Sequence, residues 1–370
     1  MPISTINTNS IADDAVTVPK VTDQVLTHRN LIINGAMQVA QRGTSETGVN
    51  STQYANGPDR WKVAINHGTF TISQSTTAPA GFATSYKFDC TTADTSLAAD
   101  AQINLQQRIE GLNVQSIKKG TSDAKPVTVS FHVRSNKTGT YICSLFDEDN
   151  QRRVAKTYTI DSANTWERKT ITFPADTTGA LNNDTGIGLY VQWYIAAGSN
   201  YTSGTLATTW ESQTEANICP GLTVNMADST DNEWYITGIQ LEVGDTATPF
   251  EHRSYGEELS LCQRYYQRIT ATGGTNHYVG TLQAYSSANV FGLIAQYIVP
   301  LRTKPTVGQS GTFKSSRAGS QDTGNATIDN FAGSDVGWMT GGWGGGTYTA
   351  GNAAIAKWTE NAYLEADAEL

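Results

Sequence analysis

The sequence predicts an all-β protein: a jelly-roll β-sandwich, a short linking helix and a second, carboxy-terminal β domain. Three observations predict this class. Apolar and polar residues alternate along many short runs, as over residues 127–133, which is the pattern of half-buried strands. Groups of Asn, Asp and Gly separate these runs. Between residues 30 and 253, about nine or ten such strands fit an antiparallel sandwich.

The composition excludes several classes of protein. The 370 residues include 34 acidic and 25 basic ones, giving a formal net charge of −9, and no basic stripe suits duplex nucleic acid. No apolar run approaches the ~20 residues of a membrane-spanning helix. The first residues lack the pattern of a secretory signal. We therefore expect no nucleic-acid partner and no insertion into a membrane.

Residues 1–28 differ from the rest of the chain. They contain no aromatic residue, and Pro19 interrupts their few apolar positions, so they cannot build a core alone. We expect this segment either to be disordered or to dock as an extended peptide on another protein.

Residues 29–253 contain the strands of the predicted sandwich. In two of them an aromatic pair, Trp193-Tyr194 and Trp234-Tyr235, must turn one ring to the core and the other outward. An outward ring can serve as a flat platform for a sugar. The alternation changes phase at Gly238, which predicts a β-bulge.

Residues 254–270 are predicted to link the two domains through a helix at 255–269. An S-x-x-E capping box at 254–257 marks its start, and a Gly pair at 273–274 stops it. A narrow apolar stripe with helical spacing either packs on its own domain or forms a seam between copies of the chain. We take it as the seam of an oligomer, formed by Leu259, Cys262, Tyr266 and Ile269.

Residues 271–370 return to alternation and predict the second β domain. The run 290–299 is apolar on both faces, which predicts a strand buried on both sides. A glycine-rich segment contains three aromatic residues, Trp338, Trp343 and Tyr348. Rings in such a segment are less often needed to fill a core. Because loops on a rigid β scaffold often carry recognition, we predict that these three residues bind a ligand. A plain contact between subunits is the alternative.

No catalytic residues are predicted. None of the five histidines lies in a nucleophile motif, and Asp89, Glu110 and Glu233 have no evident partner for glycoside hydrolysis. The acidic run 147–149 predicts a solvated turn, with weak Ca²⁺ binding as the lesser alternative. The four cysteines lie far apart, which indicates buried free thiols rather than a zinc site or disulfides. We expect neither a metal nor a cofactor.

Several segments carry a resemblance to a known family: residues 11–17, 30–37, 59–61, 236–244, 247–251, 261–266, 301–307 and 366–370. In this order they resemble parts of bacteriophage tail fibres. The first resembles an amino-terminal segment, the next four the entry and exit of a jelly-roll module, and the last three the carboxy-terminal domain. The entry also resembles carbohydrate-binding jelly rolls that hold a structural Ca²⁺. This chain departs from that site, because Gln38 and Gly238 replace its acids.

The resemblance implies a homotrimeric appendage of the virion, made in the host cytoplasm, that attaches to glycans of the host surface. Residues 1–28 would join it to phage tail proteins. The low fraction of charged residues, 16%, fits neutral glycans bound by stacking and hydrogen bonds. Two alternatives remain open: a polysaccharide depolymerase of the tailspike kind, and a purely structural fibre or decoration protein of the virion.

Overall fold

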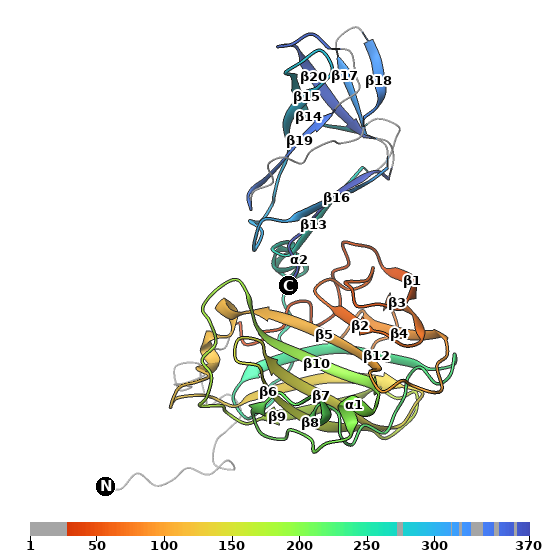
Figure 1. The fold of residues 1–370 in the computed structure, drawn as a ribbon, viewed down its shortest axis with the longest axis vertical. Helices are drawn as coiled ribbons and strands as arrows, with labels where there is room; N and C mark the ends of the chain where they lie inside the picture. The colour runs from red at the N-terminus through yellow and green to blue at the C-terminus, as the bar shows by residue number, and fades with distance from the viewer. Residues whose placement is uncertain are drawn as a thin grey trace.

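The computed structural model describes residues 28–271, 277–311, 313–317, 320–326, 336–343, 348–358 and 361–370. Figure 1 shows a broad β-sandwich from which a narrower β unit projects, with helix α2 between them. The all-β prediction is confirmed. The segment 1–28, predicted to join other proteins, lies outside the described residues except for His28. In the described part, no helix is long and apolar enough to cross a membrane.

The sandwich consists of two six-stranded antiparallel sheets. The first has the order β1 (Ser45–Val49), β3 (Thr69–Ser75), β4 (Ser85–Thr92), β12 (Glu233–Val243), β6 (Val127–Ser135) and β9 (Glu167–Phe173). The second has the order β11 (Glu211–Ser212), β8 (Arg152–Ile160), β7 (Gly139–Asp147), β10 (Ile187–Ala197), β5 (Gln102–Glu110) and β2 (Lys62–Ile65). Short helical turns occur in the connections: η3 (Gly111–Asn113), η4 (Gln115–Ile117), α1 (Ser199–Thr202) and η5 (Glu215–Asn217).

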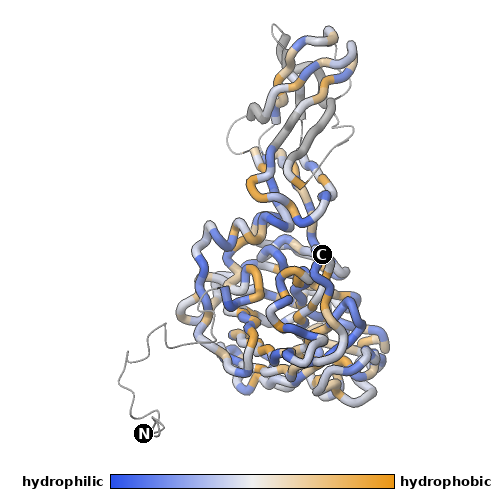
Figure 2. The backbone as a smooth tube through the Cα atoms, turned by 90° about the vertical axis from the view of Figure 1, so that its left-hand side faces the viewer, coloured by the Kyte–Doolittle hydropathy of each residue, from blue (hydrophilic) through white to orange (hydrophobic). Residues whose placement is uncertain are grey.

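The alternation seen in the sequence produces the core between the two sheets. Trp61, Trp193 and Trp234 are almost completely buried there, and the rings of Trp61 and Trp193 meet edge to face at 5.8 Å. Burying a large apolar side chain stabilises the fold by about 1.5–3 kcal/mol. Tyr194 and Tyr235 lie on the outer faces, so one ring of each adjacent pair is core, as predicted. Hydrophobic and hydrophilic residues are accordingly interspersed along the chain in Figure 2.

The predicted β-bulge at Gly238 is confirmed. Strand β12 shifts register against β6 between Thr237 and Gln240, and Gly238 has a φ of 61°. A side chain here would also collide, because a Cβ atom would lie 2.5 Å from the ring of Phe82. Glycine is therefore required at this position both for its conformation and for its small size. The predicted free thiols are confirmed too, since all four cysteines are buried and unpaired.

Helix α2 (Tyr255–Gln263) is shorter than predicted. Its start is as expected, because the backbone N–H of Glu257 donates to the Ser254 hydroxyl at 3.3 Å. Beyond the helix, Tyr266–Thr270 forms strand β13, which pairs antiparallel with β21 (Tyr363–Asp367). The prediction of helix up to residue 269 is wrong, because pairing with a segment far along the chain outweighs a local apolar stripe.

The four residues predicted as an oligomer seam do not share one helical face. Cys262 and Tyr266 are buried inside the chain, at 0% and 1% exposed, while Leu259 and Ile269 are half-buried. The Tyr266 hydroxyl donates to Glu365 at 2.5 Å. Cys262, Tyr266 and Ile269 therefore pack within the chain, and a seam between copies stays a prediction.

Two sheets form the second β unit. The smaller has the order β13, β21 and β16 (Thr306–Ser310); the larger has β18 (Ser320–Ala326), β17 (Phe313–Arg317), β20 (Ala353–Trp358), β14 (His277–Ala284), β15 (Val290–Gln296) and β19 (Trp338–Trp343). The prediction that 290–299 is buried on both faces is wrong. Val290 is fully buried, whereas Phe291 is 41% and Ile298 78% exposed. The exposed rings and chains of Phe291 and Ile298 therefore do not pack in the core of this unit, whereas Val290 does.

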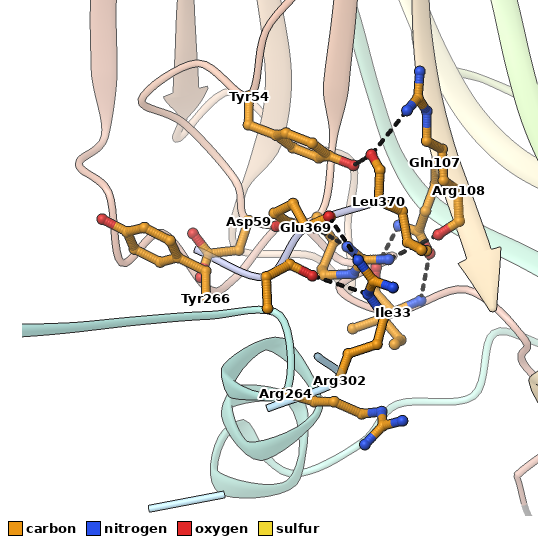
Figure 3. A network of polar contacts seen from close by, with 12 residues as sticks. Ile33, Tyr54, Asp59, Gln107, Arg108, Arg264, Tyr266, Arg302, Glu369 and Leu370 are labelled. Atoms are coloured by element: carbon orange, nitrogen blue, oxygen red, sulfur yellow. Dashed lines mark hydrogen bonds and ion pairs between the residues drawn. The ribbon is translucent and has the colours of Figure 1, made fainter. Parts of the chain in front are cut away.

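The last residues of the sequence lie between the two units (Figure 1), and Figure 3 shows their polar contacts. Arg302 of the second unit donates to the carbonyl of Glu369 at 2.9 Å. On the sandwich side, Tyr54 and Arg108 each donate to the main-chain oxygen of Leu370 at 2.9 Å. The segment therefore joins the second unit to strand β5 of the sandwich.

Candidate functional site

Four side chains form a row across the outer face of the second sheet. Tyr190 on β10 lies directly opposite Arg108 on β5 and Phe146 on β7, and Phe146 lies opposite Arg153 on β8. These residues point away from the core because their neighbours, such as Val191, point into it. We call Arg108, Tyr190, Phe146 and Arg153 the arginine–aromatic row.

Cations flank the two rings of this row. The Arg108 Cζ atom lies 4.9 Å from the Tyr190 ring centroid, and the Arg153 Cζ atom lies 4.7 Å from that of Phe146. The two ring centroids are 5.4 Å apart with an interplanar angle of 57°. Each guanidinium is thus held against an aromatic face, which fixes its position.

Polar side chains occupy the neighbouring rows of the same face. Arg153 Nη1 donates to Ser144 Oγ at 2.8 Å and to Gln192 Oε1 at 2.7 Å. Asn104 is 1% exposed, and its Oδ1 has no hydrogen-bond partner in the described part of the structure. A buried acceptor without a partner costs free energy, and a bound water molecule would lower this cost.

The arginine–aromatic row, together with Asn104 and Gln192, lines a shallow pocket of about 300 Å³. Its wall on one side comes from the segment that carries α1, β11 and η5, with Tyr201, Gln213 and Glu215; Thr52 lines it as well. The pocket therefore combines aromatic rings, amides and two arginines over four strands. Such a mixture suits a polyhydroxylated molecule, whose apolar faces stack on rings while its hydroxyls exchange hydrogen bonds.

The tyrosines of the pocket remain protonated at neutral pH. Burial raises the pKa of Tyr194 to about 12, against the opposing charge of Arg153. Burial also raises the pKa of Tyr190, which the charge of Arg108 partly offsets. Both hydroxyls are thus hydrogen-bond donors and acceptors rather than bases.

Among the described lining residues Glu215 is the single carboxylate, so the pocket lacks the acid pair that glycoside hydrolysis uses. The acids weighed from the sequence lie elsewhere in ion pairs. Glu110 is bound by both nitrogens of one edge of Arg264, at 2.8 Å each. Asp89 and Glu233 share Lys87, at 3.4 and 2.7 Å. The Lys87 hydrogen bond contributes to holding the pKa of Glu233 below its ordinary value, although burial opposes this.

The prediction of a solvated acidic turn is wrong for Asp147. This carboxylate ends strand β7, is fully buried, and forms an ion pair with the buried Lys119. Lys119 also reaches Asp176, at 3.0 Å. No group of three or more His, Cys, Asp and Glu residues that could hold a metal occurs in the described ranges.

The predicted ligand residues lie in the second unit, away from the pocket. Trp338 and Trp343 begin and end strand β19, and their side chains lie outside the described part. Tyr348 is 6% exposed, belongs to the core of this unit, and hydrogen-bonds through its hydroxyl to Ser315. Its ring is therefore not the exposed platform that the glycine-rich surroundings suggested.

The arginine–aromatic row was not predicted from the sequence. The available signal was the outer face of β10, where Tyr190, Gln192 and Tyr194 alternate with the core residues Val191 and Trp193. Aromatic and amide residues on a face expected to meet water indicate a binding surface.

No family model matches the chain, and no curated protein does. The chain is similar to solved structures at low identity. A tailspike protein 4 domain of bacteriophage CBA120 is 11% identical, with a TM-score of 0.29 over 58% of this chain and 21% of that one. The match thus spans about a fifth of the tailspike domain's length.

Two carbohydrate-binding modules are similar as well. A family 11 module from Clostridium thermocellum, in complex with a mixed-linked tetrasaccharide, is 8% identical, with a TM-score of 0.27 over 57% of this chain and 99% of that one. TmCBM61, in complex with β-1,4-galactotriose, is 11% identical, with a TM-score of 0.27 over 58% and 99%. At these values the similarities identify neither a family nor a ligand for this chain.

Proposed function

We propose that this chain is a receptor-binding fibre protein of a bacteriophage tail, which attaches the virion to glycans of the host surface. The observation that carries the proposal is the pocket of about 300 Å³ on the outer face of the second sheet, where the arginine–aromatic row adjoins amides and an unpartnered Asn104 oxygen. Rings and amides on rigid strands bind sugars without breaking bonds. The order of tail-fibre-like segments along the sequence supports the place of the protein on a virion.

In this proposal three chains form one fibre, and residues 1–28 join it to other tail proteins. Weak contacts with single sugars then add up, because linked sites raise the effective concentration of the second and third contacts. The protein needs no catalytic residue, metal or cofactor for this role.

A glycan array probed with the purified full chain tests the binding step. We expect binding to surface polysaccharides of the host, and competition of the free protein with phage adsorption. Light scattering after size exclusion tests the assembly, with a mass of three chains expected.

Incubation with the same polysaccharides, followed by an assay for new reducing ends, separates binding from cleavage. Release of reducing ends by the wild-type chain would favour a depolymerase. An array without any bound glycan, together with unaffected adsorption, would favour a purely structural fibre.

A further inference from the structure

Arg153 is a buried cation without a charged partner. It is 4% exposed, and the hydrogen-bond partners of its guanidinium in the described part of the chain are all neutral. Its hydrogen bonds go to the neutral side chains of Ser144, Gln192 and Gln213. Burying an uncompensated charge is costly, so such an arrangement persists where something else compensates it.

Other well-buried cations of the chain pair with carboxylates. Arg60 pairs with Glu369, Arg253 with Glu258, and Lys119 with Asp147 and Asp176. The exception lies in the pocket, where Arg153 faces the cavity. This contrast indicates that the negative charge for Arg153 comes from the ligand.

One edge of the Arg153 guanidinium is held only by a neutral side chain that a ligand could displace, that of Gln213. On its inner side, Nη1 is fixed by Ser144, which is fully buried, and by Gln192. On its other edge, Nε and Nη2 both donate to the same oxygen, Gln213 Oε1, at 3.3 and 3.1 Å. A carboxylate binds this edge of a guanidinium with two parallel hydrogen bonds. Gln213 is half-buried and follows the two-residue strand β11, so its amide oxygen holds the place that a carboxylate oxygen would take.

The rest of the pocket agrees with an acidic sugar. Its described lining contains two arginines, Arg108 and Arg153, but one glutamate, Glu215, within a chain of net charge −9. Asn104 lies four residues from Arg108 along β5, a span of roughly 13 Å, and adds a neutral amide to the lining. The site therefore has a charged part and a neutral part along the same strands.

We infer that the pocket binds a saccharide carrying a carboxylate, such as a uronic acid unit, and that Arg153 binds this carboxylate after Gln213 moves aside. The inference rests on the proposed glycan binding at this pocket. The low fraction of charged residues in the whole chain favoured a neutral glycan. The inferred ligand is acidic instead, because it is the charge of the pocket lining that determines which ligand binds there.

Binding of defined oligosaccharides by isothermal titration tests the inference. The probes are oligogalacturonate and oligoglucuronate, the same compounds after reduction of the carboxyl groups to alcohols, and a sulfated neutral oligosaccharide. We expect at least one carboxylated probe to bind, with at least tenfold weaker binding after carboxyl reduction and weaker binding at higher salt. A sulfated probe that binds as tightly as the carboxylated ones would assign the site to anions in general and overturn the choice of a carboxylate.

Gln213→Glu is the decisive variant, because it supplies Arg153 with a carboxylate from the chain itself. We expect it to fold at least as stably as the wild type and to bind the carboxylated probe at least tenfold more weakly. Gln213→Ala, which removes the competing oxygen, is expected to bind that probe as well as or better than the wild type. Unchanged affinity in Gln213→Glu would overturn the role of Arg153.

The outcomes separate this inference from the proposed function. Binding of carboxylated and reduced probes with equal affinity, with loss of both in Tyr190→Ala, would overturn the acidic ligand and keep the glycan site. Binding of no saccharide, on the array or in titration, would overturn both.

Discussion

The guanidinium of Arg60 lies over the ring of Tyr265, with the Cζ atom 3.3 Å from the ring centroid, and this contact links the two β units of the chain. Arg60 belongs to the sandwich and is 1% exposed, and Tyr265 follows helix α2. The same guanidinium pairs with the carboxylate of Glu369, whose side chain is 3% exposed. A cation, a ring and an anion from three distant segments thus meet at one buried point of the junction.

This buried pair predicts a large loss of stability on Glu369→Gln. Removing one partner leaves the charge of Arg60 buried without its anion, which typically costs about 3–5 kcal/mol. We expect a clear drop in the urea midpoint, followed by tryptophan fluorescence, and faster proteolysis between the two units.

The exposed ion pair of Asp161 with Lys169 gives a matched control. It has a distance of 3.1 Å, and the Asp161 side chain is 69% exposed. Asp161→Asn should therefore cost less than about 1 kcal/mol, since water screens such pairs. An equal loss of unfolding free energy in both variants would show that Glu369 stabilises the fold no more than an exposed charge does.

The bulge in β12 predicts that Gly238→Ala destabilises the sandwich by two separate effects. A φ of 61° costs an L-residue about 1–2 kcal/mol, and the new methyl group must displace the ring of Phe82. Gly48 has a φ of 75°, and no atom lies within 4 Å of the point that a Cβ atom would occupy, so Gly48→Ala reports the conformational cost alone. We expect thermal unfolding to show a loss in Gly238→Ala that exceeds the control by at least about 1 kcal/mol.

His132 next to this bulge predicts a dependence of stability on pH. Burial, together with the charge of Arg168, lowers the pKa of His132 below its ordinary value. Its Nδ1 has no hydrogen-bond partner in the described part of the chain, and its ring contacts Phe82. Protonation is thus harder in the folded than in the unfolded chain. The free energy of unfolding is therefore highest above the ordinary histidine pKa of about 6.5, and it decreases as the pH falls below this value.

The comparison of wild type with His132→Gln measures this contribution. Between about pH 7.5 and about pH 5.5 the melting temperature of the wild type should fall by more than that of the variant, which has no titrating ring. Parallel pH profiles of the two proteins would contradict a destabilising protonation of His132.

Local signals in the sequence predicted the features that depend on neighbouring residues. The alternation over 127–133 became strand β6, the phase shift at Gly238 became a bulge, and Ser254 caps helix α2. The end of that helix could not be predicted, because the following strand β13 is stabilised by pairing with β21. The two strands are neighbours in space but lie about 100 residues apart in the sequence.

The site was missed for the same reason. Arg108, Tyr190, Phe146 and Arg153 come from four strands and meet only through the register of the sheet. Their side chains become a row only after the strand order β8-β7-β10-β5 is known. Conversely, the glycines around Tyr348 suggested an exposed ring, whereas long-range packing buries it.

The arginine–aromatic row predicts a defined loss of glycan binding in Tyr190→Ala. The ring supplies an apolar face beside Phe146 and holds Arg108 in place, and such contacts are worth about 0.5–1.5 kcal/mol each. We therefore expect about tenfold weaker binding of whichever glycan the array identifies, measured by titration. Tyr235→Ala is the control, because Tyr235 lies on the outer face of the other sheet between Lys87 and Arg134, at 5.6 and 5.0 Å. It removes a similar ring in a similar cationic setting, so it should cost stability but leave binding unchanged. If both variants bind as the wild type does, the glycan lies elsewhere on the chain.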